Sequence, residues 1–127
     1  NRDLQKRIEN EGLVLSQFMP GAEPTRQTFP MRNALMSGYG IATIIADANE
    51  HSGTRIQARQ AQRHGRPVIL NHTVMDGTQW GRGLADKPGV YVVRDAPGAS
   101  DALDYIMSID DVDMLARQLL DAAPAAI

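Results

Sequence analysis

The stretch Ile41-Ala-Thr-Ile-Ile-Ala46 is a continuous apolar run, and the polar segment Asp47-Ala-Asn-Glu-His-Ser-Gly53 follows it. A run without polar alternation is typical of a strand that is buried on both faces of a parallel sheet. Thr54 and Gln57 have the spacing of a capping box, which predicts a helix from about residue 55 to residue 64. Strand, loop and helix in this order predict the first half of a βαβ unit.

Apolar runs of the same kind lie on both sides of this unit. They predict three further strands, at residues 13–15, 68–70 and 90–93. Helices are predicted at residues 2–11, after Thr28 with a stop at Gly38 and Gly40, and near residues 100–107 and 110–122, whereas residues 71–88 are expected to be irregular. The alternation predicts an α/β fold with a doubly wound, mostly parallel sheet of about four strands.

The composition is that of one globular domain of 127 residues without cysteine. The absence of cysteine excludes disulfides and thiolate metal sites. The three histidines are scattered, and the glycine-rich and serine motifs of P-loop proteins, dinucleotide-binding proteins and hydrolases do not occur. We therefore expect no catalytic residue, no cofactor and no metal. No apolar run reaches the roughly 20 residues of a membrane helix, so we expect no membrane contact and a cytoplasmic location.

The charges are distributed unevenly along the chain. Residues 1–66 contain nine Lys or Arg against six Asp or Glu, a net charge of +3, whereas residues 67–127 contain four against nine, a net charge of −5. Arginine outnumbers lysine eleven to two, and arginine favours bidentate contact with phosphate. The basic half either binds a polyanion or reflects a chance division of solvated surface charge.

Ligands of doubly wound sheets bind beyond the carboxyl ends of the strands, which here points to residues 16–33, 47–55 and 71–82. In the first segment Arg26 precedes Phe29 by three residues. A cation beside an exposed ring is a simple unit for single-stranded nucleic acid. Alternatively, Phe29 is buried beneath its helix and Arg26 is solvated. In the second segment Ser52 and Gly53 precede a helix and are either a phosphate cradle or a plain N-cap.

An ordered set of motifs over about residues 1–70 resembles the DNA-processing protein family called DprA or Smf. The set is Gly12-Leu13-Val14-Leu15-Ser16, Pro20-Gly21, Phe29-Pro30-x-Arg32-Asn33, Ser52-Gly53-Thr54 with Ala58, and His64-Gly65-Arg66-Pro67-Val68. The resemblance implies a Rossmann-like domain, usually dimeric, that binds single-stranded DNA and passes it to the recombinase RecA during natural transformation. It implies no bond-making reaction.

Carried over by position, the family's DNA-binding residues are Arg26, Phe29, Arg32, Asn33, Ser52 and Gly53. The chain departs from the family pattern at Asp47, where a glutamate is usual, and again after Leu70. It also lacks the family's first βα unit, so we expect residues 1–127 to be a single domain with an incomplete sheet. An exposed edge strand would then pair with a second copy or another chain.

The alternative is a nucleotide-binding domain like the LOG proteins, which share the scaffold. Their Pro-Gly-Gly-x-Gly-Thr phosphate loop does not occur in this sequence.

Overall fold

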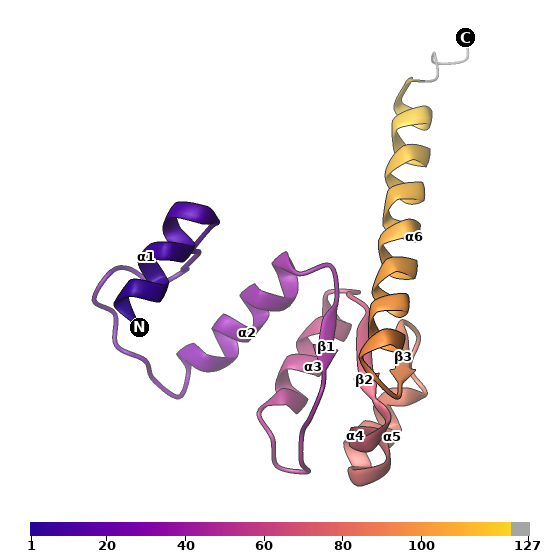
Figure 1. The fold of residues 1–127 in the computed structure, drawn as a ribbon, viewed down its shortest axis with the longest axis horizontal. Coiled ribbons are helices and arrows are strands. Elements are labelled where there is room, and N and C mark those ends of the chain that lie inside the picture. The colour runs from indigo at the N-terminus through magenta and orange to yellow at the C-terminus, as the bar shows by residue number, and fades with distance from the viewer. Residues whose placement is uncertain (123–127) are drawn as a thin grey trace.

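The computed structural model describes the backbone of residues 1–122 and the side chains of residues 1–110, 112 and 113. Figure 1 shows the order of the elements along the chain. In that order they are α1 (Arg2–Glu11), α2 (Thr28–Tyr39), β1 (Thr43–Ile45), α3 (Thr54–Arg63), β2 (Val68–Asn71), α4 (His72–Gly77), α5 (Gln79–Ala85), β3 (Val90–Val93) and α6 (Ala96–Ala122).

The strands form one parallel sheet of three strands in the order β1-β2-β3. Ile69 of β2 is in register with Ile44 of β1 and Tyr91 of β3. Helices connect each strand to the next, as parallel pairing requires. The predicted α/β fold with a parallel, Rossmann-like sheet is confirmed.

One face of the sheet carries the hydrophobic core. Ile45, Val68 and Leu70 point to this face and pack with Ala58 and Ala61 of α3. Val74 of α4 and Leu84 of α5 complete the cluster. The two alanines are buried and small, so α3 lies close to the sheet and its position is well fixed.

The opposite face is only partly covered. Helix α6 contacts β2 and β3, and the rings of Tyr91 and Tyr105 meet edge to face with their centroids 6.1 Å apart. Ile44 of β1 lies beyond this cover and is 54% exposed. Strand β1 has no pairing partner on its outer side within the part of the chain that the structure describes.

The predicted strand at residues 13–15 is wrong, and the sheet of the described residues therefore has three strands rather than about four. Leu13, Val14 and Leu15 lie in the loop between α1 and α2, and Leu13 is 74% exposed. A short apolar run becomes a strand only when a neighbouring strand pairs with its backbone. Periodicity does not reveal whether such a neighbour is within reach.

Residues 71–88 were also predicted wrongly, because the segment contains α4 and α5. Each helix is capped by a side chain at its start. Asn71 Oδ1 accepts a hydrogen bond from the Thr73 N–H at 3.2 Å, and Thr78 Oγ1 accepts one from the Gly81 N–H at 2.9 Å. Asn and Thr favour helix caps as well as loops, so these residues alone do not distinguish a short capped helix from an irregular segment.

The two helices predicted near residues 100–107 and 110–122 form the single helix α6. The prediction of two helices rested on a Ser or Asp in a capping position at each one. The structure shows instead that Ser108 Oγ donates a hydrogen bond to the Tyr105 carbonyl at 2.7 Å, within the helix. The hydroxyl is thus satisfied inside the helix and does not act as a cap.

Helices α2 and α3 pack against each other in the same direction. Near their carboxyl ends Ser37 Oγ lies 2.9 Å from His64 Nδ1, and the Arg66 guanidinium donates to the Gly38 carbonyl at 3.3 Å. Both helices therefore begin at the other end of the pair, where Phe29, Pro30, Gly53 and Thr54 line one pocket. Over the described residues, no helix combines the length and the apolar character needed to cross a membrane.

Candidate nucleic-acid interface

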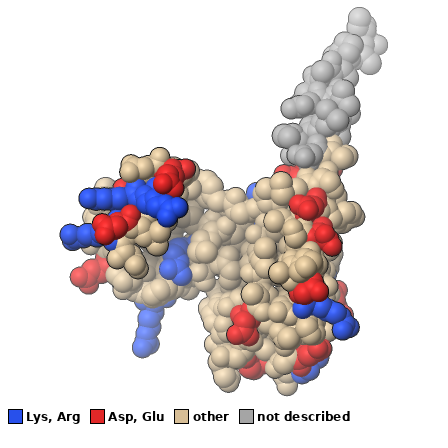
Figure 2. Space-filling view, viewed as in Figure 1, with Lys and Arg blue, Asp and Glu red and all other residues tan. Residues whose placement is uncertain are grey.

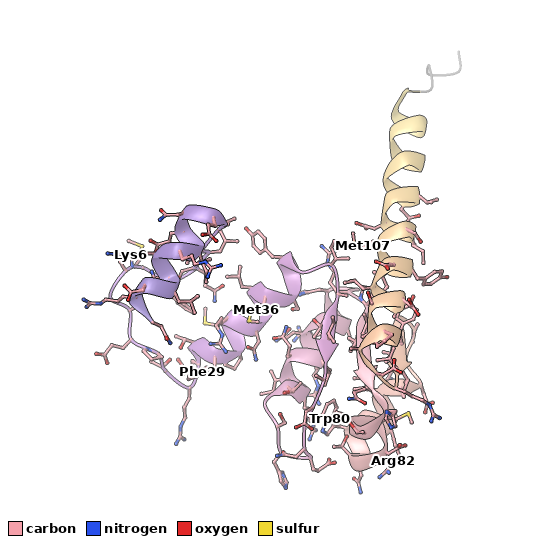
Figure 3. All side chains as sticks on the ribbon, in the orientation of Figure 1. Lys6, Phe29, Met36, Trp80, Arg82 and Met107 are labelled. Atoms are coloured by element: carbon pink, nitrogen blue, oxygen red, sulfur yellow. The ribbon has the colours of Figure 1, made fainter. Side chains whose placement is uncertain are left out.

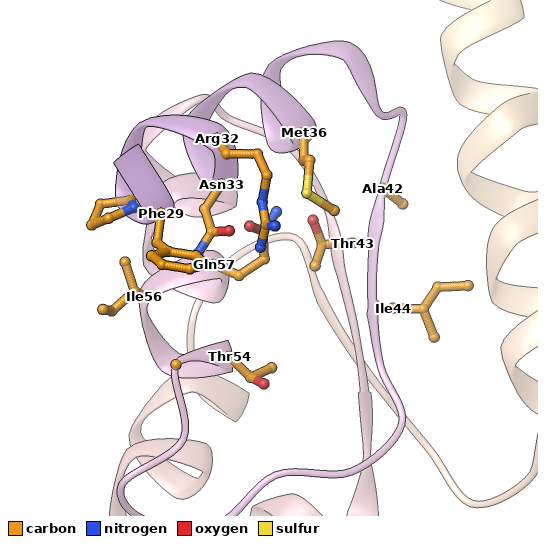
Figure 4. Close-up of a pocket in the computed structure, with 12 residues that line it drawn as sticks. Phe29, Arg32, Asn33, Met36, Ala42, Thr43, Ile44, Thr54, Ile56 and Gln57 are labelled. Atoms are coloured by element: carbon orange, nitrogen blue, oxygen red, sulfur yellow. The ribbon is translucent and has the colours of Figure 1, made fainter. Parts of the chain in front are cut away.

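A groove of about 740 Å³ separates α2 from β1 and the first turns of α3 (Figure 4). Its walls combine an aromatic ring, aliphatic side chains and a few polar groups. The lining residues are Phe29, Pro30, Arg32, Asn33, Met36, Ala42, Thr43, Ile44, Gly53, Thr54, Ile56 and Gln57. A concave, largely apolar wall with a few convergent polar groups is the usual form of a binding site.

The α2 wall presents an aromatic ring beside a cation. Phe29 is 48% exposed, so it is not a buried staple of its helix. The Arg32 guanidinium carbon lies 5.4 Å from the centroid of the Phe29 ring, within the range of a cation–π contact. This contact covers one side of the ring and holds the guanidinium at the groove.

The start of α2 is fixed by a local hydrogen-bond pair. Thr28 Oγ1 accepts from the Thr25 N–H at 2.8 Å and donates to the Thr25 carbonyl at 2.9 Å. Thr28 is the first helical residue, and Pro30 lies in the first turn, where its missing N–H costs nothing. The sequence thus places Phe29 at the very beginning of the helix.

The α3 wall presents a helix amino terminus. The helix begins at Thr54, after the N-cap Gly53. The N–H groups of Arg55 and Ile56 donate to the carbonyls of Ser52 and Gly53 at 3.2 and 2.9 Å. Ser52 Oγ accepts from the Thr54 N–H at 3.2 Å and donates to Thr54 Oγ1 at 2.8 Å. The predicted capping box of Thr54 and Gln57 is therefore wrong, because Ser52 binds the first N–H instead.

Gln57 supplies an unsatisfied acceptor in the groove. Its Oε1 atom is buried and has no hydrogen-bond partner. Figure 4 shows Gln57 beside Arg32 and Asn33, between the two helices. A buried acceptor without a partner is unfavourable, and a donor on a ligand in the groove would satisfy it.

The two helices that form the groove are basic. Together α2 and α3 contain Arg32, Arg55, Arg59 and Arg63 and no Asp or Glu. Among side chains that the structure describes, the one ion pair joins Arg7 and Glu11 on α1, so these four arginines are not neutralised by a neighbour. The view in Figure 2 shows acidic side chains over α6 and the elements below it. The amino-terminal ends of α2 and α3 add further positive potential.

The structure brings together four of the six predicted site residues. Phe29, Arg32, Asn33 and Gly53 line the groove. Ser52 lines an adjoining hollow. Arg26 is exposed in the loop before α2 and is not among the residues that line the groove.

Sequence reasoning missed Gln57 and Met36 as groove residues. Both are on helix faces turned toward the neighbouring helix or strand, as their place in the groove shows. The only signal in the sequence was the position of Gln57 in the first turn after Gly53. Met36 gave no signal, because an apolar residue in a helix is most often part of a core.

Comparison with known proteins gives the family. Residues 1–86 match the model of the DNA recombination-mediator protein A family, which is more than half of the chain. The chain belongs to this family. The predicted resemblance to DprA and Smf proteins is confirmed.

Individual relatives carry the corresponding names. The chain is 37% identical over 78 residues to the DNA processing protein DprA of Streptococcus pneumoniae, which covers 61% of this chain and 28% of that protein. It is 38% identical over 69 residues to Protein Smf of Synechocystis, covering 54% of this chain and 17% of that protein. It is 35% identical over 69 residues to the DNA processing protein DprA of Bacillus subtilis, covering 54% of this chain and 23% of that protein.

The chain thus matches less than a third of the length of each of these relatives. No solved structure matches it significantly.

Proposed function

We propose that the groove between α2 and α3 binds single-stranded DNA and that the protein acts in DNA recombination by presenting this strand to a RecA-type recombinase. The observation that carries the proposal is the juxtaposition of Phe29 and Arg32 with the amino terminus of α3. Family membership supports the recombination role. An aromatic ring and a basic groove are the two parts that single-strand binding requires.

Each group has a role in this proposal. A base stacks on the side of Phe29 that Arg32 leaves open, and the Arg32 guanidinium contacts a phosphate. The amino-terminal end of α3 at Gly53 attracts a second phosphate through the positive end of the helix dipole. Asn33 and Gln57 contact base edges, while Arg26 and Ser52 contact the strand where it leaves the groove.

The role requires no bond-making step, and the names of the relatives describe processing and mediation of recombination. We propose a cytoplasmic location and a homodimer. The open edge of β1 and the exposed Ile44 support association with a second copy, because an unpaired edge strand readily pairs with another chain.

The test is a titration of labelled oligo-dT followed by fluorescence anisotropy at several salt concentrations. Affinity should fall with salt, and Arg32→Ala should reduce the slope of log K against log salt by about 0.7, since one phosphate contact is lost. Arg26→Ala should reduce it by no more than this. Arg2→Ala on α1, outside the groove, is the matched control. Equal slopes for Arg32→Ala and the wild type would contradict the assignment of Arg32.

Titration of the same preparation with a panel of mononucleotides distinguishes single-stranded DNA binding from the LOG-like, nucleotide-binding alternative. Under our proposal mononucleotides compete only weakly, because each provides one base and one phosphate group. Saturable mononucleotide binding without oligo-dT binding would instead favour the LOG-like function.

A further inference from the structure

A second basic cleft lies on the other side of α3, between this helix and α5. Its volume is about 270 Å³. Three cations, Arg55, Arg59 and Lys87, border it, and no acidic residue does. Its full lining is Arg55, Ala58, Arg59, Gln62, Trp80, Gly83, Leu84 and Lys87.

Trp80 is the only tryptophan of the chain and forms one wall of this cleft. Its indole Nε1–H donates to the Asn49 carbonyl at 3.1 Å, and part of the ring packs against the core cluster. The hydrogen bond fixes the orientation of the ring. Trp80 is only partly buried and lines the cleft, so part of its surface is available to a flat ligand.

The Trp80 cleft and the groove at Phe29 are linked by a middle hollow that shares lining residues with both. A middle hollow lies over the first turns of α3 and shares Ile56 with the groove. The same hollow shares Arg55 and Arg59 with the Trp80 cleft. In Figure 3 the labelled Phe29 and Trp80 lie on opposite sides of α3, toward the same end of the molecule.

The middle hollow contains one acidic residue, Glu50. Glu50 Oε2 accepts a hydrogen bond from the Gln79 N–H at 2.8 Å, which ties its charge to the amino terminus of α5. Arg55 and Arg59 make no ion pair among the described side chains. The groove, the middle hollow and the Trp80 cleft thus form a row with an aromatic ring at each end, Phe29 and Trp80. Between the rings lie Arg55 and Arg59, which have no ion-pair partner among the described side chains.

We infer that the Trp80 cleft is a second binding site for the same DNA strand, in which a base stacks on Trp80 while Arg59 and Lys87 contact phosphates. Arg55 guides the backbone between the two sites. The inference rests on the proposed function, which names the ligand, but it concerns a different set of residues. A strand that reaches both rings gains two stacked bases instead of one.

The test uses the intrinsic fluorescence of Trp80, since a single tryptophan reports on this cleft alone. Oligo-dT without a label should reduce the emission and protect Trp80 from acrylamide, saturating at the same concentration as the anisotropy of a labelled strand. The double variant Arg59→Gln with Lys87→Gln should lose this change and reduce the salt slope by about 1.4, which corresponds to two phosphate contacts. Both side chains are exposed, so the variant should fold normally.

Arg63→Gln is the matched control, because Arg63 is an exposed arginine of the same helix and does not line the cleft. It should retain the fluorescence change. Binding by anisotropy with unchanged emission and unchanged acrylamide access would overturn the second site and leave the proposed function intact. No oligo-dT binding at low salt by either signal would overturn both.

Discussion

Two regions of the molecule differ in how their apolar residues are used. In the βα core, residues 43–93, Val68, Ile69 and Leu70 are completely buried beneath α3 and α6. In the N-terminal arm, residues 1–27, α1 has no buried residue, and Leu13 is exposed. Similar apolar runs therefore form a buried strand in the core and an exposed loop in the arm, because only the runs in the core have a neighbouring strand and a covering helix.

The groove lies at the border between these regions. Its α3 wall belongs to the core, whereas its α2 wall follows the arm and is tied to the core near Ser37 and Gly38. The arm itself reaches α2 through Phe18 and Met19, which border a hollow beside Phe29. The position of α2 thus decides whether the site is formed.

The largest expected effect is a difference between the two regions in how a leucine truncation changes the free energy of unfolding. Leu70→Ala should reduce the free energy of unfolding by about 2–5 kcal/mol, because a fully buried leucine is truncated. Leu13→Ala in the arm should change it by less than about 0.5 kcal/mol. Urea denaturation measures both. A large loss for Leu13→Ala would mean that residues 13–15 pack as the strand that their sequence suggests.

A pair of glycines in α5 tests the packing inside the core. A Cβ at Gly81 would lie 2.5 Å from the Val74 carbonyl oxygen and 2.6 Å from Thr78 Oγ1. Gly81→Ala should therefore destabilise the protein by about 1–3 kcal/mol. A Cβ at Gly83 meets nothing within 4 Å, so Gly83→Ala should stabilise the helix by about 0.5–1 kcal/mol. Thermal unfolding that gave both variants the same stability would contradict the close approach of α4 and α5.

The two regions also differ in how far the sequence predicts them. The runs at 41–46, 68–70 and 90–93 predicted the strands of the sheet, because a continuous apolar run between turn residues has few other uses in a parallel α/β fold. Leu13–Leu15 looked the same and is not a strand. The difference lies in tertiary contacts, which a local pattern does not contain.

Only part of the site was predictable from the sequence, because a local pattern identifies residues on one element but not contacts between elements. Phe29, Arg32 and Asn33 are neighbours on one helix, so one motif identified them together. Gln57 lines the groove and Trp80 lines the second cleft because α3 packs against α2 and α5. No residue spacing in the sequence predicts this packing. Thr78, interpreted as a loop residue, caps α5 and thereby positions Trp80.

Alanine variants of the two phenylalanines, Phe29 in the groove and Phe18 in the arm, show how much each region contributes to DNA affinity. Phe29→Ala should weaken oligo-dT binding by about 1–3 kcal/mol and leave the salt slope unchanged, since a stacked base is lost and no phosphate contact is. Phe18→Ala, in the arm, should have a smaller effect on affinity. Anisotropy titrations at two salt concentrations measure both quantities. Equal losses for the two variants would show that the arm, and not the groove alone, holds the bases.

The smallest expected effect concerns the tie between α2 and the core. Ser37 is almost completely buried, and its hydroxyl lies 2.9 Å from His64 Nδ1. Ser37→Ala should reduce stability by about 0.5–1.5 kcal/mol, the usual net value of one hydrogen bond. Hydrogen exchange should accelerate in α2 and not in β2. Uniform acceleration would show that α2 unfolds only together with the core.

The most direct test of the groove is an NMR titration of the ¹⁵N-labelled chain with unlabelled oligo-dT. We predict that the largest amide shifts fall on Phe29, on Met31 to Asn33 and on Gly53 to Gln57, on the two sides of one groove. Amides of α1 and of residues 13–15 should shift little. Shifts confined to the N-terminal arm, or no shifts at concentrations that saturate other single-strand binding proteins, would contradict the account.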